Sequence, residues 1–107
     1  AMTIIPVVQI PELPQINKEV IFKWRDVDKY SAGVYTFRVN DTDVSIEIIH
    51  FDESITKENG VIRKISGGKK ITLIPTNSSG DYYIIYNNGT LGLCDNDGCW
   101  KTLNPTN

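Results

Sequence analysis

The chain has 107 residues, of which 40% are hydrophobic and 22% are charged, and its formal net charge at pH 7 is −2. This length and balance are typical of one folded domain with a modest core, and they exclude a disordered or fibrous chain. The slight acidity argues against binding to the phosphate backbone of a nucleic acid, and no apolar run approaches the about 20 residues of a membrane span.

The first fifteen residues include Pro6, Pro11 and Pro14. Because proline has no backbone N–H to donate to a neighbouring strand, this segment is expected to be an extended arm or an edge strand. We therefore expect residues 1–15 to precede a single β domain that spans residues 16–107.

From residue 20 onward, apolar and polar residues alternate with a period of two, which is typical of strands with one buried face. Val20, Phe22 and Trp24 share one side of the first such segment. The breaks between segments are rich in residues that favour tight turns, and Asn87-Asn88-Gly89 is a strong hairpin signal. The pattern predicts short strands at residues 20–25, 35–39, 44–51, 61–65, 71–74, 82–86, 91–94 and 99–103.

The best candidate for a helix is residues 52–59, which read DESITKEN. Asp52 is a residue type that caps helix N-termini, and Glu53 and Lys57 are spaced as an i, i+4 ion pair. This segment is expected to be one helical turn or a loop.

Short strands joined by tight turns indicate an all-β fold in which each strand pairs with its neighbours in sequence. We expect an antiparallel meander of about eight strands that forms a curled sheet or a small up-and-down barrel, with an Ig-like β-sandwich as the alternative. Residues 30–35 loosely resemble an immunoglobulin strand, but the chain lacks the Cys…Trp…Cys framework of that fold.

The C-terminal half resembles the last hairpins of small lipocalin-like extracytoplasmic β domains. The resemblance consists of a Gly-x-Tyr strand, an Asn-Gly turn, a Leu-x-Leu strand and an Asp-Gly turn, at Gly80, Tyr82, Asn88, Gly89, Leu91, Leu93, Asp97 and Gly98. It implies a barrel rather than a sandwich, and it assigns no functional residue.

Both cysteines lie in the sequence LCDNDGCW, residues 93–100. A four-residue turn at residues 95–98 would bring Cys94 and Cys99 opposite each other, within the range of a disulfide bond. Such a bond would indicate an oxidising compartment, whereas a pair of free thiols is the alternative. A redox CxxC motif needs two intervening residues and a zinc site needs more ligands. The same alternation predicts that Leu91, Leu93 and Trp100 face the core.

The sequence offers no constellation of catalytic residues, so we expect a protein that is not an enzyme and holds no metal or cofactor. His50 is the only histidine, and it lies at the end of an apolar strand, where a structural role is commoner than that of a catalytic base. The carboxylate pairs Asp26/Asp28 and Asp41/Asp43 lie in turn sequence, which explains them better than glycosidase chemistry.

Aromatic residues are candidates for contact with a binding partner. Alternation along residues 82–86 places Tyr82 and Tyr86 on one face and Tyr83 on the other, so this strand is apolar on both faces. Either it is a central strand with both faces covered, or one face contacts a protein or a sugar ring. The candidate contact residues are Tyr82, Tyr83, Tyr86, Trp100 and Trp24.

Three Asn-x-Ser/Thr sequences, at Asn40, Asn77 and Asn88, lie in expected turns and are candidate glycosylation sites.

These features favour a non-catalytic binding module that recognises a protein or carbohydrate partner, with an inhibitor or an adhesion-type domain as special cases. We expect an extracellular, periplasmic or cell-surface location. The alternative is a lipocalin-like carrier of a small apolar ligand inside a barrel. A homodimer formed through exposed strand edges is also compatible with the sequence.

Overall fold

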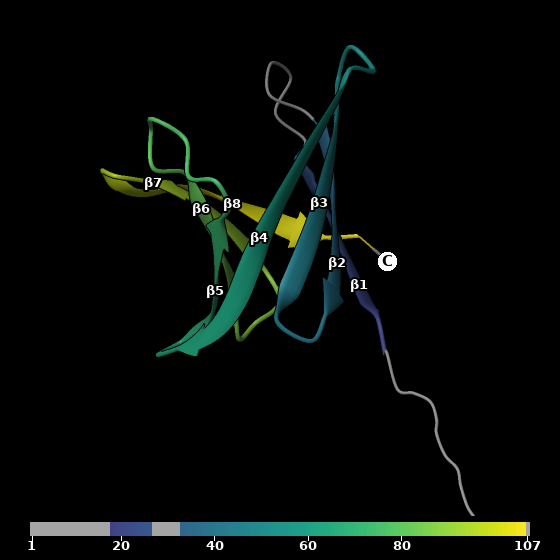
Figure 1. Ribbon diagram of the computed structural model, residues 1–107. Coiled ribbons are helices and arrows are strands. Elements are labelled where there is room, and N and C mark those ends of the chain that lie inside the picture. The colour runs from purple at the N-terminus through teal and green to yellow at the C-terminus, as the bar shows by residue number, and fades with distance from the viewer. Residues whose placement is uncertain (1–17, 27–32, 107) are drawn as a thin grey trace, which may run out of the picture.

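The computed structural model of the protein describes residues 18–26 and 33–106. Within these ranges the chain forms β-strands and no helix, and the strands pair in sequence order as an antiparallel meander that closes into a barrel (Figure 1). The barrel expected from the sequence is therefore confirmed, and the sandwich is not formed. The arm expected over residues 1–15 lies outside the described residues.

The expected alternation of buried and less buried residues is clearest in Val20–Asp26, Asp43–His50 and Tyr82–Tyr86. Among the described residues, no helix is long and apolar enough to cross a membrane. The strands are β1 (Val20–Asp26), β2 (Gly33–Asn40), β3 (Asp43–His50), β4 (Ile55–Ile65), β5 (Gly68–Leu73), β6 (Tyr82–Tyr86), β7 (Leu91–Asp95) and β8 (Gly98–Pro105).

The helical turn expected within residues 52–59 is wrong, because β4 begins at Ile55. Asp52 ends a tight turn rather than capping a helix: its Oδ1 accepts hydrogen bonds from the backbone N and the hydroxyl of Ser54, at 3.0 and 2.6 Å. Glu53 has a φ of 71°, a left-handed conformation that cannot continue an α-helix. The following residues then pair with β3, from Ile49 opposite Ile55 onward.

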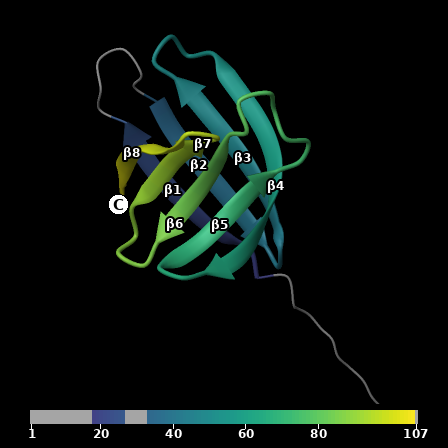
Figure 2. The same ribbon diagram turned by 90° about the vertical axis from the view of Figure 1, so that its left-hand side faces the viewer.

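The barrel closes where β8 meets β1, and we call this contact the seam. Trp24 pairs with Pro105 and Arg25 pairs with Asn104. Beyond these two pairs, the backbone N of Thr106 donates to the carbonyl of Lys23 at 2.9 Å. Figures 1 and 2 show β8 running up to β1, so the first and last strands of the meander are neighbours.

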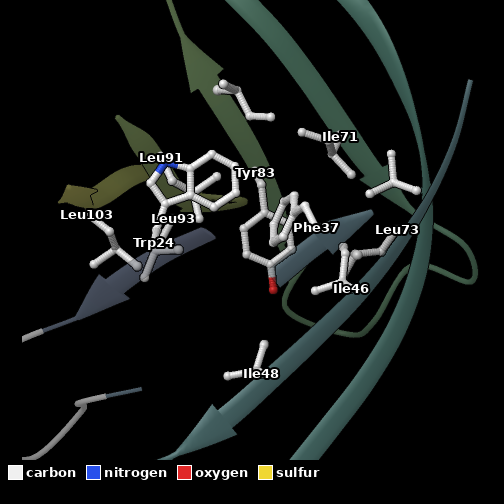
Figure 3. Close-up of a cluster of buried hydrophobic side chains, with 12 residues drawn as sticks. Trp24, Phe37, Ile46, Ile48, Ile71, Leu73, Tyr83, Leu91, Leu93 and Leu103 are labelled. Atoms are coloured by element: carbon white, nitrogen blue, oxygen red, sulfur yellow. The ribbon is translucent and has the colours of Figure 1, made fainter. Parts of the chain in front are cut away.

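The interior is filled by a cluster of buried hydrophobic side chains contributed by every strand of the barrel except β4 (Figure 3). Its centre is a row of aromatic rings: Trp24 meets Phe37 edge-on at a centroid distance of 5.0 Å, and Phe37 meets Tyr83 in the same way at 5.0 Å. The indole N–H of Trp24 is satisfied by the carbonyl of Gly89, at 2.8 Å. An eight-stranded barrel has an interior that side chains can fill, and here they fill most of it.

Cys94 and Cys99 form the expected disulfide and are direct partners across β7 and β8. The turn between them is tighter than expected, because Asp95 pairs with Gly98 and leaves two residues in the turn. Gly98 has a φ of 113°, which favours glycine, and the carboxylate of Asp95 accepts a hydrogen bond from the backbone N of Asp97 at 2.8 Å.

The aromatic row predicts that replacing Phe37 by alanine destabilises the fold much more than replacing Phe51 does. Phe37 is 0% exposed and Phe51 is 66% exposed. We expect Phe37→Ala to lower the free energy of unfolding by about 3–5 kcal/mol through the cavity it leaves, and Phe51→Ala to change it by less than about 0.5 kcal/mol. Urea unfolding of both variants measures this, and equal effects would contradict the described packing.

Candidate functional site

One end of the barrel, which we call the mouth, is where β1, β3, β5 and β7 end and β2, β4, β6 and β8 begin. Inward-facing positions in the middle of the barrel are apolar, whereas several of those at the mouth are polar. On β1, for example, the inward series Phe22, Trp24 ends in Asp26. The polar inward residues are Asp26, Tyr35, His50, Thr56, Glu58 and Lys101.

A pocket of about 200 Å³ opens at the mouth. Its walls combine three aromatic rings, two carboxylates, a histidine, a threonine and an apolar remainder. The lining residues are Tyr35, Tyr83, Trp100, Glu58, Asp81, His50, Thr56, Ile48, Leu93 and Cys94. Sites for small molecules usually measure about 300–1,000 Å³, so this pocket suits a single side chain or a group of similar size.

Tyr83 connects the apolar interior to the polar mouth. Its ring packs beside Phe37, and Figure 3 shows its hydroxyl pointing away from Trp24. That hydroxyl donates a hydrogen bond to Oε1 of Glu58 at 2.8 Å. Burial raises the pKa of Tyr83 well above its ordinary value, and the carboxylate of Glu58 raises it further. Tyr83 is therefore a neutral hydrogen-bond donor at physiological pH.

Tyr35 faces Tyr83 across the pocket, with ring centroids 6.5 Å apart and an interplanar angle of 71°. Burial raises the pKa of Tyr35, and the nearby carboxylate of Asp26 adds to the effect, while the ammonium of Lys101 opposes it. The two phenol rings and the carboxylate of Glu58 thus form the polar wall of the pocket.

A buried ion pair lies beside this wall. Nζ of Lys101 is 2.8 Å from Oδ2 of Asp26, and the Asp26 side chain is 2% exposed. Because a buried carboxylate without a cation would be costly, Lys101 offsets the charge that Asp26 brings into the barrel. This pair joins the first strand to the last.

His50 closes another side of the pocket. Its Nε2 lies 2.6 Å from the hydroxyl oxygen of Thr56, on the adjacent strand. The contact orients the imidazole through a neighbouring side chain, and a purely structural role for His50 stays a prediction.

Trp100 is not in the core, so the sequence expectation for its side chain is wrong. Leu93 pairs with Lys101 and Cys94 pairs with Cys99, which leaves Trp100 as the extra residue of a β-bulge. The bulge breaks the alternation that would have turned the indole inward. Trp100 is instead 62% exposed and lies at the edge of the pocket, next to the disulfide.

The other candidate contact residues lie elsewhere. Trp24 is 1% exposed and belongs to the core, and its indole bonds to the turn at the opposite end of the barrel. Tyr82 and Tyr86 are on the outer face of β6: the ammonium of Lys70 lies 4.5 Å from the Tyr82 ring centroid, and the Tyr86 ring covers Gly92. The mouth therefore brings together only Tyr83 and Trp100 of the five candidates.

The three candidate glycosylation sites are all exposed. The side-chain oxygen of Asn88 accepts hydrogen bonds from the backbone N and the hydroxyl of Thr90, at 3.0 and 2.7 Å. The side-chain amide of Asn77 donates to Asp81 at 2.9 Å, and Asn40 ends β2. Glycosylation at these positions stays a prediction.

The sequence did not single out Tyr35, Glu58 or Asp81. Glu58 lies in the segment expected to be helical, so its place on an inward-facing strand position was hidden. Thr56, Glu58 and Gly60 do have the spacing of one strand face, and this signal becomes visible once β4 is known to start at Ile55.

Large exposed hydrophobic residues gather around the mouth. Seven large hydrophobic residues among the described ones are exposed, and five of them lie at this end. We call these five the apolar rim: Ile49 (37% exposed), Phe51 (66%), Ile55 (56%), Ile74 (56%) and Trp100 (62%). The remaining two, Val20 and Ile21, lie at the start of β1.

Comparison of the chain with protein-family models, with curated protein sequences and with solved structures found no match. What the mouth can do follows from its own geometry and charge.

The raised pKa values of Tyr35 and Tyr83 predict a loss of stability in alkali. A group whose pKa is higher in the folded state stabilises the fold fully below its unfolded pKa, here about 10, and loses this contribution as the pH rises above it. We expect the free energy of unfolding to fall as the pH rises above 10, by up to about 1.4 kcal/mol per pH unit for the more deeply buried Tyr83, and Tyr35 adds to this loss.

Urea unfolding from pH 8 to pH 11 measures this slope. Tyr83→Phe removes one of the two ionisations and should make the slope shallower, whereas Tyr82→Phe, on the outer face, is the matched control. A slope that Tyr83→Phe leaves unchanged would contradict the described environment of Tyr83.

The two ion pairs of the described residues predict unequal effects on stability. Asp26 and Lys101 are largely buried, whereas Arg38 and Glu19, 3.7 Å apart, are about half exposed. We expect Lys101→Met to lower the free energy of unfolding by about 3 kcal/mol and Arg38→Met to lower it by less than about 1 kcal/mol. Thermal and urea unfolding of the two variants make the comparison, and an equal loss would mean that the seam does not depend on Lys101.

Proposed function

We propose that the protein is a non-catalytic recognition module that works outside the cytoplasm and binds a protein partner through the mouth of its barrel. The observation that carries this proposal is Trp100, which is 62% exposed on a bulge next to the disulfide, at the edge of a pocket. Tryptophan is among the residues most enriched at the centres of protein interfaces.

The support of Trp100 matters as much as its exposure. Cys99, the residue before Trp100, is bonded to Cys94 on β7 through the disulfide. Lys101, the residue after Trp100, forms an ion pair with Asp26 on β1. A residue whose backbone is held on both sides loses less conformational freedom on binding, so more of its contact energy contributes to affinity.

The apolar rim extends the same surface. Phe51 and Ile55 lie at the tip of the β3–β4 hairpin, which projects from the barrel in Figure 1. Exposed apolar residues scattered singly are normal in proteins, but their gathering at one end around a pocket is a feature of interaction sites.

A carrier of a small apolar ligand is less well supported. The aromatic row of Trp24, Phe37 and Tyr83 occupies the barrel interior, and the pocket at the mouth is only about 200 Å³ and includes two carboxylates in its lining. A carbohydrate partner is the second candidate, because the exposed indole of Trp100 can stack on a sugar ring beside the carboxylates of Glu58 and Asp81.

The location outside the cytoplasm rests on the disulfide. Disulfides persist in oxidising compartments and are rare in the cytosol. Cys94 and Cys99 are the only cysteines of the chain, and they are bonded to each other.

Selection of peptide ligands from a random display library on the immobilised, oxidised protein tests this function, with a glycan array for the second candidate. We expect selected ligands to bind Trp100→Ala at least about tenfold more weakly, as is typical of an interface residue worth more than 1 kcal/mol. Val20→Ala, an exposed apolar change at the other end of the barrel, should leave their binding unchanged. Ligands that bind Trp100→Ala as tightly as the unmodified protein, or a selection that yields none from either source, would overturn the proposal.

A further inference from the structure

The charge inside the mouth pocket is negative and unbalanced within the described part of the chain. Glu58 and Asp81 line the pocket, and no lysine or arginine is among its lining residues. The ion pairs of the described residues are Arg38 with Glu19 and Lys101 with Asp26, so neither pocket carboxylate takes part in one.

Both pocket carboxylates are held in place by neutral donors. Oε1 of Glu58 accepts the Tyr83 hydroxyl at 2.8 Å, and Oδ2 of Asp81 accepts the side-chain amide of Asn77 at 2.9 Å. A carboxylate oriented in this way keeps lone pairs for a further donor, and a cationic donor gives the strongest bond.

The remaining walls also favour a cation. The rings of Tyr35, Tyr83 and Trp100 line the pocket, and the faces of aromatic rings attract ammonium and guanidinium groups. The carboxylate of Glu58 accepts the Tyr83 hydroxyl and lines the same pocket as the Tyr35 ring, whose centroid is 6.5 Å from that of Tyr83, so it borders the space between the two rings. A cation in that space would interact with the rings and the carboxylate together.

The described turns at the mouth carry charge of the same sign as the pocket. The described turns at the mouth contain acidic residues and no lysine or arginine: Asp52 and Glu53 after β3, Asp81 before β6, and Asp97 in the turn after β7. The β4–β5 hairpin at the other end is basic, with Arg63, Lys64, Lys69 and Lys70. The β2–β3 turn at that end carries Asp41 and Asp43, so it is the acidic turns of the mouth, and not a separation of charge along the barrel, that would attract a basic partner.

We propose that the mouth pocket receives one basic side chain of the partner protein, with arginine preferred over lysine. This inference rests on the proposed function. Arginine is preferred because its planar guanidinium stacks on aromatic faces while donating to carboxylates. A protein side chain is favoured over a free amine because the apolar rim at the same end offers a partner protein further contacts outside the pocket of about 200 Å³.

Nuclear magnetic resonance titration of the oxidised, isotope-labelled protein tests the pocket directly. The probes are N-acetyl-arginine amide, N-acetyl-lysine amide and N-acetyl-citrulline amide, the last being a neutral analogue of arginine with nearly the same shape. We expect the arginine probe to shift the Trp100 indole signal with a dissociation constant on the order of millimolar, as befits so small a ligand. The citrulline probe should bind at least about tenfold more weakly.

Two matched variants distinguish the effect of a carboxylate in the pocket from the effect of the protein's net charge. Glu58→Gln keeps an acceptor for Tyr83 but removes the charge, and it should weaken the arginine probe about tenfold or more. Glu47→Gln makes the same change on the outer face of β3 and should have no effect. Asp81→Asn, measured in parallel, should also weaken the probe, and it covers the case in which Glu58→Gln fails to fold. Equal binding of citrulline and arginine, or insensitivity to both Glu58→Gln and Asp81→Asn, would overturn the inference.

The outcome for this inference is distinguishable from that for the proposed function. Selected peptides that need Trp100 but tolerate replacement of every arginine and lysine by citrulline or norleucine would leave the recognition function standing and overturn the basic side chain. Selected peptides that ignore Trp100 would overturn the function itself, whereas the arginine probe tests the pocket independently of any peptide.

Discussion

The barrel is closed along the seam between β1 and β8, and every feature of the mouth depends on this closure. Only two residue pairs join these strands, whereas other neighbouring strands share four to eight. A side-chain contact completes the seam, because Lys101 on β8 reaches Asp26 on β1. A meander whose ends stayed apart would leave two unpaired edges, which invite pairing with other chains. Closure instead gives the sheet one interior, and it places the bulge with Trp100 at the rim of that interior.

The interior of the barrel has two parts, an apolar part that stabilises the fold and a polar part at the mouth. Aromatic and aliphatic side chains fill it from the middle to the end where Trp24 bonds to Gly89, and this part supplies the stability. At the mouth the inward positions are polar, which stabilises a barrel less than apolar packing would, because buried polar groups need partners. The hydrogen bond from Tyr83 to Glu58 provides one such partner. The polar wall and the apolar rim beside it support our proposal that this end of the barrel binds another molecule.

Much of the fold could be predicted from the sequence, because the alternation of residues and the turn chemistry are local signals. The disulfide followed from two cysteines on either side of a short turn. The site was harder to predict. The start of β4 was hidden because its inward residues, Thr56 and Glu58, are polar where a strand core is normally apolar. The bulge at Trp100 adds a single residue to β8 and shifts the pairing of β8 with β7 by one position. Alternation along one strand cannot reveal this shift, because the shift depends on how the two strands pair. Seam contacts between residues about 80 positions apart leave no local pattern at all.

The central claim is that the mouth is open and negatively charged while the other tryptophan is sealed in the core. Paramagnetic relaxation of the two indole N–H signals by soluble cationic and anionic nitroxides tests both parts at once. The account predicts that the Trp100 signal is relaxed strongly, and more by the cationic than by the anionic nitroxide, whereas the Trp24 signal is hardly affected by either. A protected Trp100, an accessible Trp24, or stronger relaxation of Trp100 by the anionic nitroxide would contradict it.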